Sequence, residues 1–180
     1  MGAVVILTAG FVVWAVASSG SGTSKTATVR FDGTPVPPPQ ASPIGVRLAN
    51  AVGRANLGRR YRRVDMARVA PFAWDRLLVF QDETRADING RLGFEWSGAP
   101  ARVPRGSERE ALLAFVRGRQ VAGSAFFSAA IGHLDCLTAP TGYARGTPFV
   151  VRFTPKHEPY LAAAKPSPSD AACLRSVGAR

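Results

Sequence analysis

The sequence predicts an α+β domain, in which a small antiparallel sheet is covered by one helix and preceded by an N-terminal membrane helix. Three features support this prediction: an apolar run that leads into a helix start, three later segments with strand patterns, and an uncharged apolar N-terminus. A strand, a helix and then a set of strands is the element order of α+β proteins, whose helices gather on one face of an antiparallel sheet.

Residues 1–19 form the segment that predicts membrane targeting. No charged side chain occurs between Gly2 and Ser24, and Ala3–Ala17 is the most apolar part. Its length lies between that of a signal-peptide core and that of a membrane-spanning helix. Ala15–Ala17 fits a signal-peptidase site, whereas the usual preceding Lys or Arg is absent. We therefore expect a single-pass anchor with an extracytoplasmic domain; a secreted product cleaved near Ala17 and a buried core helix are the alternatives.

Residues 20–43 are rich in Gly, Ser, Thr and Pro, and several prolines lie close together near their end. Such a stretch cannot bury enough apolar surface to offset its ordering entropy, and prolines keep it extended. It is predicted to be a linker. The expected organisation is thus a targeting segment at 1–19, a linker at 20–43, a basic helical neck at 44–63, an extracytoplasmic domain at 64–156 and a tail at 157–180.

The positive charge of the chain is concentrated in residues 44–70. Seven arginines and one aspartate in this stretch give a net charge of +6, out of +11 for the whole chain. Val46, Ala49, Val52 and Ala55 recur at a spacing that favours a weakly amphipathic helix. The candidate contacts with an anionic surface are Arg54, Arg59, Arg60, Arg62 and Arg63.

Three interpretations of this basic segment remain open: a solvated helix face without a partner, contact with anionic lipids or acidic wall polymers, and nucleic-acid binding. Clustered arginines near an anionic membrane gain about 1 kcal/mol per charge. Nucleic-acid binding calls for aromatic side chains that stack on bases, and Tyr61 is the only one interleaved here, so a nucleic-acid partner is not expected. The expected partners are the membrane, an anionic lipid or wall polymer, and an unidentified protein.

A buried strand and a helix are predicted in the middle of the chain. Leu77–Phe80 is an uninterrupted apolar run, which is typical of a strand buried on both faces. Thr84 followed three residues later by Asp87 predicts a capping box at a helix start. The helix is expected to run over Arg85–Leu92 and to end at Gly93, which readily takes the left-handed conformation.

Three stretches of this chain, Val64–Ala67, Pro71–Phe80 and Leu92–Trp96, resemble a group of small secreted or membrane-anchored bacterial proteins of unassigned function. The resemblance covers about residues 64–153 and centres on a Pro-Phe-x-Trp-Asp-Arg motif that leads into four apolar residues. Gln81–Thr84 departs from the group, in which a Pro-Tyr-containing turn is common at this place. The resemblance implies a compact mixed α/β unit outside the cytoplasm, without an assigned activity.

Trp74 and Asp75 within this motif are candidates for a structural or functional role. An Asp beside a buried strand can act as a general base or a ligand. More often it accepts hydrogen bonds from a turn or pairs with an arginine, and this structural interpretation is the one we favour. Trp74 is expected to be a core aromatic rather than a ligand platform.

A hairpin and a further strand are predicted after the helix. Ala111–Val116 and Val121–Phe127 read as two strands joined by a turn over Arg117–Gln120, in which Gly118 can take a positive φ. Pro148–Phe153 alternates in the manner of a third strand. These three strands are expected to form one antiparallel set.

Cys136 and Cys173 are candidates for a disulfide, because paired cysteines in an exported chain are usually oxidised. The alternative is a small hydrolase or thiol enzyme that uses Cys136 with His133 and Asp135. The sequence contains no phosphate-binding loop, Gly-x-Ser-x-Gly or His-Glu-x-x-His motif and no metal-ligand spacing. No catalytic, cofactor-binding or metal-binding residue is therefore assigned, and a binding module is the expected function.

Overall fold

The computed structural model describes residues 7–8, 11–12, 42–57, 62–104 and 110–180. The chain forms two compact units, Met1–Gln40 and Ala41–Arg180. In the first unit, β1 (Leu7–Thr8) pairs antiparallel with β2 (Phe11–Val12). These strands give no support to the predicted membrane helix, most of which lies outside the described residues together with nearly all of the predicted linker. Within the described residues, no helix is both long and apolar enough to span a bilayer.

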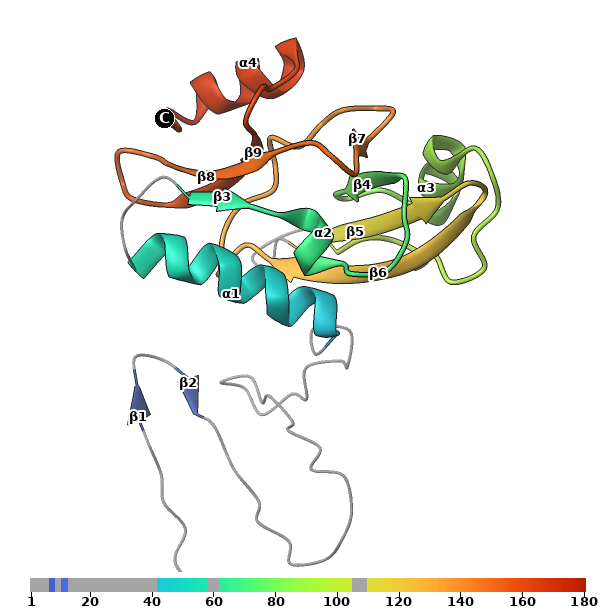
Figure 1. The fold of residues 1–180 in the computed structure, drawn as a ribbon, viewed down its shortest axis with the longest axis horizontal. Helices are drawn as coiled ribbons and strands as arrows, with labels where there is room; N and C mark the ends of the chain where they lie inside the picture. Colours follow the sequence, from blue (N-terminus) through green and yellow to red (C-terminus); the bar gives the residue numbers. More distant parts are fainter. Residues whose placement is uncertain (1–6, 9–10, 13–41, 58–61, 105–109) are drawn as a thin grey trace, which may run out of the picture. The chain divides into compact units, whose positions relative to one another are not determined.

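The second unit is α+β, as predicted, but it contains two antiparallel sheets instead of one (Figure 1). The strand orders are β3-β8-β9 and β6-β5-β4-β7. The elements in chain order are α1 (Pro43–Leu57), β3 (Arg62–Val64), α2 (Met66–Val69), β4 (Arg76–Phe80), α3 (Arg85–Leu92), β5 (Glu110–Arg117), β6 (Gln120–Ser128), β7 (Tyr143–Ala144), β8 (Phe149–Phe153), β9 (Pro159–Ala163) and α4 (Pro168–Ser176).

The predicted elements around β4 are confirmed. β4 lies between β5 and β7, and its apolar run is buried on both faces. At the start of α3, the Thr84 backbone N–H donates to the Asp87 carboxylate over 3.0 Å, and the Asp87 N–H donates back to the Thr84 hydroxyl. Gly93 closes the helix with a φ of 77°. The β5–β6 hairpin also forms as expected, with Gly118 at a φ of 56° in its turn.

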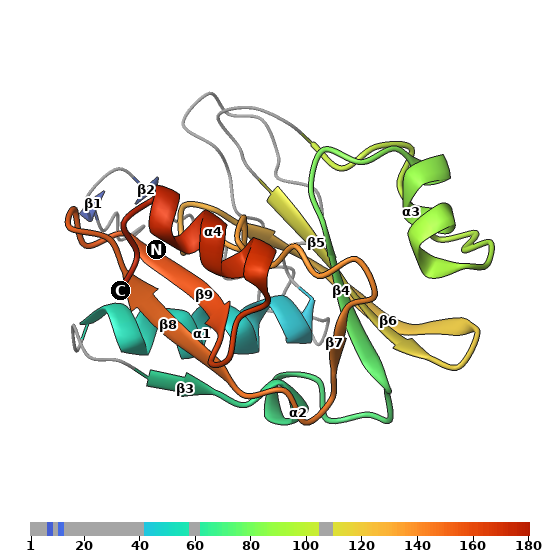
Figure 2. The same cartoon turned by 90° about the horizontal axis from the view of Figure 1, so that it is seen from above.

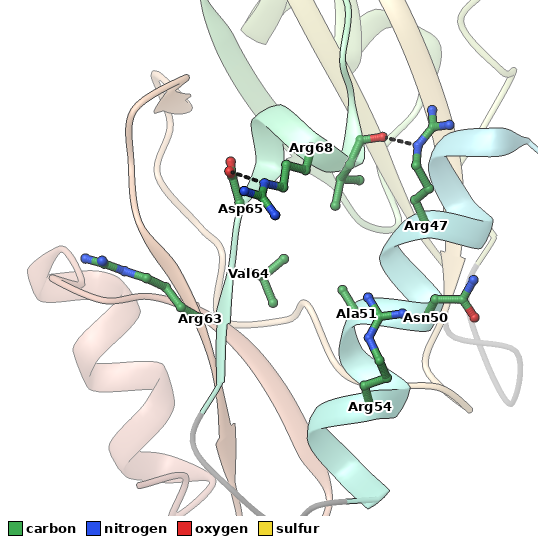
Figure 3. A pocket seen from close by; sticks show the side chains of 9 residues that line it. Arg47, Asn50, Ala51, Arg54, Arg63, Val64, Asp65 and Arg68 are labelled. Carbon is green, nitrogen blue, oxygen red and sulfur yellow. Dashed lines mark hydrogen bonds and ion pairs between the residues drawn. The ribbon is translucent and has the colours of Figure 1, made fainter.

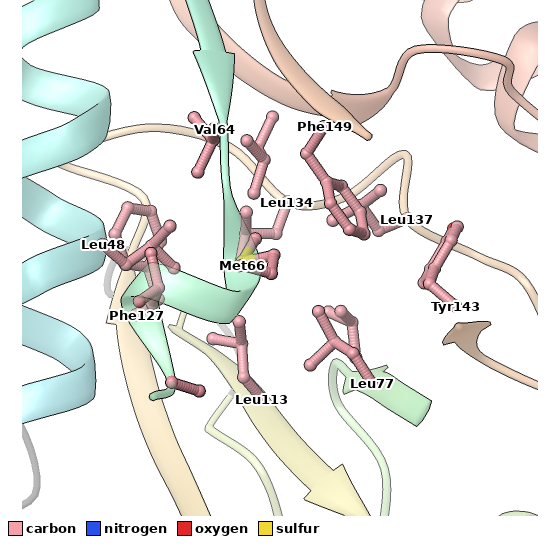
Figure 4. Close-up of a cluster of buried hydrophobic side chains, with 14 of the residues drawn as sticks. Leu48, Val64, Met66, Leu77, Leu113, Phe127, Leu134, Leu137, Tyr143 and Phe149 are labelled. Atoms are coloured by element: carbon pink, nitrogen blue, oxygen red, sulfur yellow. The ribbon is translucent and has the colours of Figure 1, made fainter. Parts of the chain in front are cut away.

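The buried apolar side chains form three clusters, because successive residues of a strand point to opposite faces of its sheet. Leu77 and Val79 of β4 point into a central cluster between the two sheets, whereas Leu78 and Phe80 point into a second cluster under α3. Figure 4 shows the central cluster, to which α1 contributes Leu48. A third cluster lies between the three-stranded sheet and α4, so that α1 and α4 cover opposite faces of this sheet (Figures 1 and 2). Apolar clusters therefore pack on both faces of the three-stranded sheet and of the four-stranded sheet.

The predicted placement of the third strand in the hairpin's sheet is wrong. Phe149–Phe153 forms β8, which pairs with β3 and β9 in the three-stranded sheet. Arg63 on β3 is the register partner of Val150 on β8. The pairing of β3 with β8 joins segments that are distant in the chain, and such pairing leaves no local signal in the sequence.

The folded unit extends beyond the predicted domain boundaries at residues 64 and 156, because it spans Ala41–Arg180. The first part of the basic segment is helical, as predicted, whereas Arg62 and Arg63 at its end belong to β3. Helix α1 is part of the folded unit and not a neck outside it. Its buried stripe is Ile44, Leu48, Val52 and Ala55. Val46, which the sequence placed on the apolar face, is 48% exposed. The predicted tail likewise forms β9 and α4, whose apolar side chains close the third cluster.

A close contact at Gly123 on β6 leads to a stability prediction. A Cβ atom at this position would lie 2.5 Å from the Phe72 Cζ atom, and the Phe72 ring is itself packed edge-on against Phe115. We expect Gly123→Ala to lower the free energy of unfolding by about 1–3 kcal/mol, since the ring has to move. Gly90→Ala in α3 is the control, because nothing lies within 4 Å of its added Cβ. Equal urea midpoints for the two variants would contradict this packing.

Candidate anion-binding groove

A groove of about 500 Å³ lies between α1 and the β3–α2 segment (Figure 3). The residues that α1 contributes are spaced i, i+3, i+4 and i+7, so they share one face of the helix, beside its buried stripe. The α1 wall is formed by Arg47, Asn50, Ala51 and Arg54. The facing wall is formed by Arg63, Val64, Asp65, Arg68 and Val69.

The two walls are joined by apolar packing and by one side-chain hydrogen bond. Val64 and Val69 are buried in the central cluster together with the stripe of α1, and this packing fixes the base of the groove. Arg47 Nε donates to the Val69 carbonyl over 2.7 Å. Val69 is the last residue of α2, where carbonyl groups lack a partner within the helix, so Arg47 satisfies this group and ties α1 to α2.

Asp65 sets the geometry of the facing wall. Its Oδ1 accepts a hydrogen bond from the Ala67 N–H over 2.9 Å and thereby caps α2. Its Oδ2 lies 3.5 Å from Arg68 Nε, and the two side chains are 57% and 90% exposed. An exposed ion pair of this kind contributes little to stability, about 0–1 kcal/mol. The guanidinium of Arg68 therefore stays available to a ligand.

Four arginines and one aspartate give the groove a net charge of +3. In Figure 3 the Arg54 side chain lies along α1 toward Ala51, whereas Arg63 extends from β3 to the side away from α1. Arg54 and Arg63 are exposed, and neither makes a hydrogen bond or ion pair within the part of the chain that the structure describes. Guanidinium groups stay charged and match carboxylate and phosphate oxygens with paired N–H donors. The groove is therefore suited to an anionic ligand.

The structure brings only some of the predicted basic contacts into this groove. Arg54 and Arg63 line it. Arg62 lies in β3, but its side chain is outside the described residues, as are Arg59 and Arg60 altogether. Arg47 and Arg68 also line the groove but were not predicted as contacts. The seven-residue spacing of Arg47 and Arg54 was a usable signal, whereas Arg68 reaches the groove only because α2 docks beside α1.

Trp74 and Asp75 serve the fold in this structure. Trp74 is buried, donates from Nε1 to the Ala70 carbonyl over 3.1 Å and packs edge-on against Phe115. Asp75 accepts a hydrogen bond from the Gly118 N–H over 2.8 Å and so holds the turn of the β5–β6 hairpin. Neither side chain lines the groove.

Cys136 and Cys173 form the predicted disulfide, with Cα atoms 5.3 Å apart. Cys136 is fully buried, so its sulfur is neither a free thiol nor accessible to a substrate. His133 Nδ1 lies 3.8 Å from the Asp135 carboxylate, and its ring stacks on Tyr160. A thiol mechanism at this place would first require reduction of the disulfide. In the described part of the chain, no group of three or more His, Cys, Asp or Glu side chains is arranged to hold a metal ion.

Comparison of the chain with protein-family models, with curated proteins and with solved structures finds no significant match. The resemblance to small exported bacterial proteins therefore stays a prediction from its motif. Any assignment of function has to come from the groove and the disulfide.

Proposed function

We propose that the protein is an extracytoplasmic binding module, tethered to the membrane or secreted, that contacts anionic surfaces through the α1–β3 groove. The observation that carries this proposal is the gathering of four arginines from three elements around one open groove. The Cys136–Cys173 disulfide is compatible with a location outside the cytoplasm, where such bonds persist. Anionic lipid head groups and acidic wall polymers are the surfaces that this charge would meet there.

Electrostatic attraction of this kind has a known size and salt dependence. A basic residue next to an anionic membrane gains about 1 kcal/mol, and salt shortens the range of this attraction to about 8 Å at physiological ionic strength. The groove's net charge of +3, within a chain of net charge +11, is enough for measurable adsorption at low salt. Binding should therefore be strong at low ionic strength and weak at high ionic strength.

The experiment is co-sedimentation of the full-length protein with phosphatidylglycerol vesicles, with phosphatidylcholine vesicles as the neutral reference. The test variant is Arg54→Gln with Arg68→Gln. The matched control is Arg117→Gln with Arg119→Gln, which removes the same charge from exposed positions at the β5–β6 turn. At about 50 mM salt we expect the groove variant to bind roughly 10- to 30-fold more weakly than the wild type, which corresponds to two lost contacts. The control is expected to change less than about 3-fold.

Two results would contradict the proposal. The first is equal weakening in the two double variants, which would mean that only total charge matters. The second is binding that does not respond to salt.

A further inference from the structure

The groove is not uniformly basic, and this distinguishes it from a general cationic patch. Asn50 lies on the α1 wall with Arg47 and Arg54, and Asp65 lies on the facing wall with Arg63 and Arg68. A carboxylate repels a simple anion, but it is a strong acceptor for hydroxyl groups. The Asp65 Oδ1 atom is occupied by the cap of α2, whereas Oδ2 has only the loose contact with Arg68. A ligand that carries both a negative group and hydroxyl groups satisfies all of these side chains.

Arg54 and Arg68 line the groove from opposite walls, and both are open to solvent. Arg54 projects from α1 and has no partner within the described residues, and Arg68 projects from α2 with 90% of its side chain exposed. Arg47 is already committed to the Val69 carbonyl, so it serves as a fixed part of the wall. A phosphate offers oxygens to two guanidinium groups at once, whereas a single carboxylate has only two oxygens in one plane.

We propose that the groove is a site for one polyol phosphate unit, such as a glycerol phosphate, with Arg54 and Arg68 on the phosphate and with Asn50 and Asp65 accepting from its hydroxyl groups. The groove volume of about 500 Å³ falls within the size range of small-molecule sites, about 300–1,000 Å³. This inference rests on the proposed function, because it specifies the chemistry that the anionic surface presents. The same unit occurs in the head group of phosphatidylglycerol and in soluble poly(glycerol phosphate).

The test is calorimetric titration of the full-length protein with glycerol 3-phosphate and with inorganic phosphate, at one fixed ionic strength. We expect glycerol 3-phosphate to bind at least 5-fold more tightly than inorganic phosphate. Competition then separates the two sources: preferential displacement of glycerol 3-phosphate by phosphatidylglycerol vesicles points to a lipid head group, and preferential displacement by poly(glycerol phosphate) points to a polymer. Equal affinity for the two small probes would overturn the hydroxyl part of the proposal.

Charge-conserving variants separate a discrete site from diffuse attraction. Arg54→Lys with Arg68→Lys keeps both charges but removes the paired N–H donors. We expect this variant to lose at least 10-fold in affinity for glycerol 3-phosphate, while its salt-dependent binding to vesicles stays within about 3-fold of the wild type. Wild-type affinity for glycerol 3-phosphate in this variant would overturn the discrete site. It would leave the proposed function standing, because that function is tested separately by the vesicle binding of the Gln variants and by its salt dependence.

Asp65→Asn tests the acceptor directly. Asn is as good an N-cap residue as Asp, so α2 should keep its start. Removal of the carboxylate is expected to strengthen binding of inorganic phosphate about 2- to 5-fold and to reduce the preference for glycerol 3-phosphate. Circular dichroism of each variant verifies that it is folded. An unchanged preference in Asp65→Asn would exclude Asp65 as the hydroxyl acceptor and overturn this part of the proposal.

Discussion

Replacing both Cys136 and Cys173 with alanine is expected to lower the free energy of unfolding by about 4 kcal/mol. The disulfide joins residues 37 positions apart, and in the chain-entropy picture a cross-link of this span removes that much entropy from the unfolded state. It also ties the loop before β7 to α4, the last element of the chain. Loss of the bond should therefore weaken the third cluster first and lower the melting temperature by roughly 10–15 °C.

Thermal unfolding with and without reductant measures this effect. The wild type should become about as unstable in reductant as the double alanine variant is, whereas the variant itself should not respond to reductant. Two titratable thiols in unreduced, denatured protein would contradict the Cys136–Cys173 disulfide. A wild-type melting temperature that reductant leaves unchanged would contradict its expected contribution to stability.

A second large loss of stability is expected when Asp170 is replaced. Asp170 is the only fully buried carboxylate among the described residues. One of its oxygens accepts a hydrogen bond from the Tyr143 hydroxyl over 2.9 Å, and the other accepts from the N–H and hydroxyl of Thr138 over 3.0 and 2.8 Å. Burial raises the pKa of the Tyr143 phenol, so the hydroxyl stays protonated as a donor at neutral pH. Asp170→Ala leaves these donors unsatisfied and should cost about 3 kcal/mol of unfolding free energy.

Asp87 provides a matched control within the same chain. Both aspartates occupy the third helical position after a hydroxyl N-cap, Asp87 in α3 and Asp170 in α4, but Asp87 is exposed. Hydrogen bonds from Thr84 hold the pKa of Asp87 below its usual range, so its contribution to stability is present at neutral pH and is lost as the pH falls through that lowered pKa. Urea unfolding at pH 7 should show a clearly smaller loss for Asp87→Ala than for Asp170→Ala. Equal losses would mean that the buried network contributes nothing beyond helix capping.

Local signals in the sequence were sufficient to predict the elements around β4. The capping pair of Thr84 and Asp87, the left-handed Gly93 and the uninterrupted run Leu77–Phe80 each depend on neighbouring residues, and each is found as predicted. The β5–β6 hairpin belongs to the same group, since its turn joins strands that are adjacent in the chain.

The second sheet and the groove could not be predicted in the same way. β3 is only three residues long and pairs with β8, which follows it in the chain only after the whole four-stranded sheet. The apolar stripe of α1 is made partly of small side chains, so its amphipathic pattern is weak although Leu48 and Val52 are fully buried. Asp65 and Arg68 face α1 only once the β3–α2 segment has packed beside α1, and no residue spacing in the sequence predicts that packing.

Photo-crosslinking in intact cells of the native host would show whether the groove between α1 and the β3–α2 segment meets an anionic surface outside the cytoplasm. A photoreactive residue in place of Asn50 would report what occupies the groove, and one in place of Ala172, exposed on α4 across the three-stranded sheet, would serve as the control. We expect position 50 to crosslink to phosphate-bearing lipid or envelope polymer outside the cytoplasm and position 172 to do so far less. Crosslinks from position 50 exclusively to cytosolic proteins, with Cys136 and Cys173 reduced, would contradict this expectation.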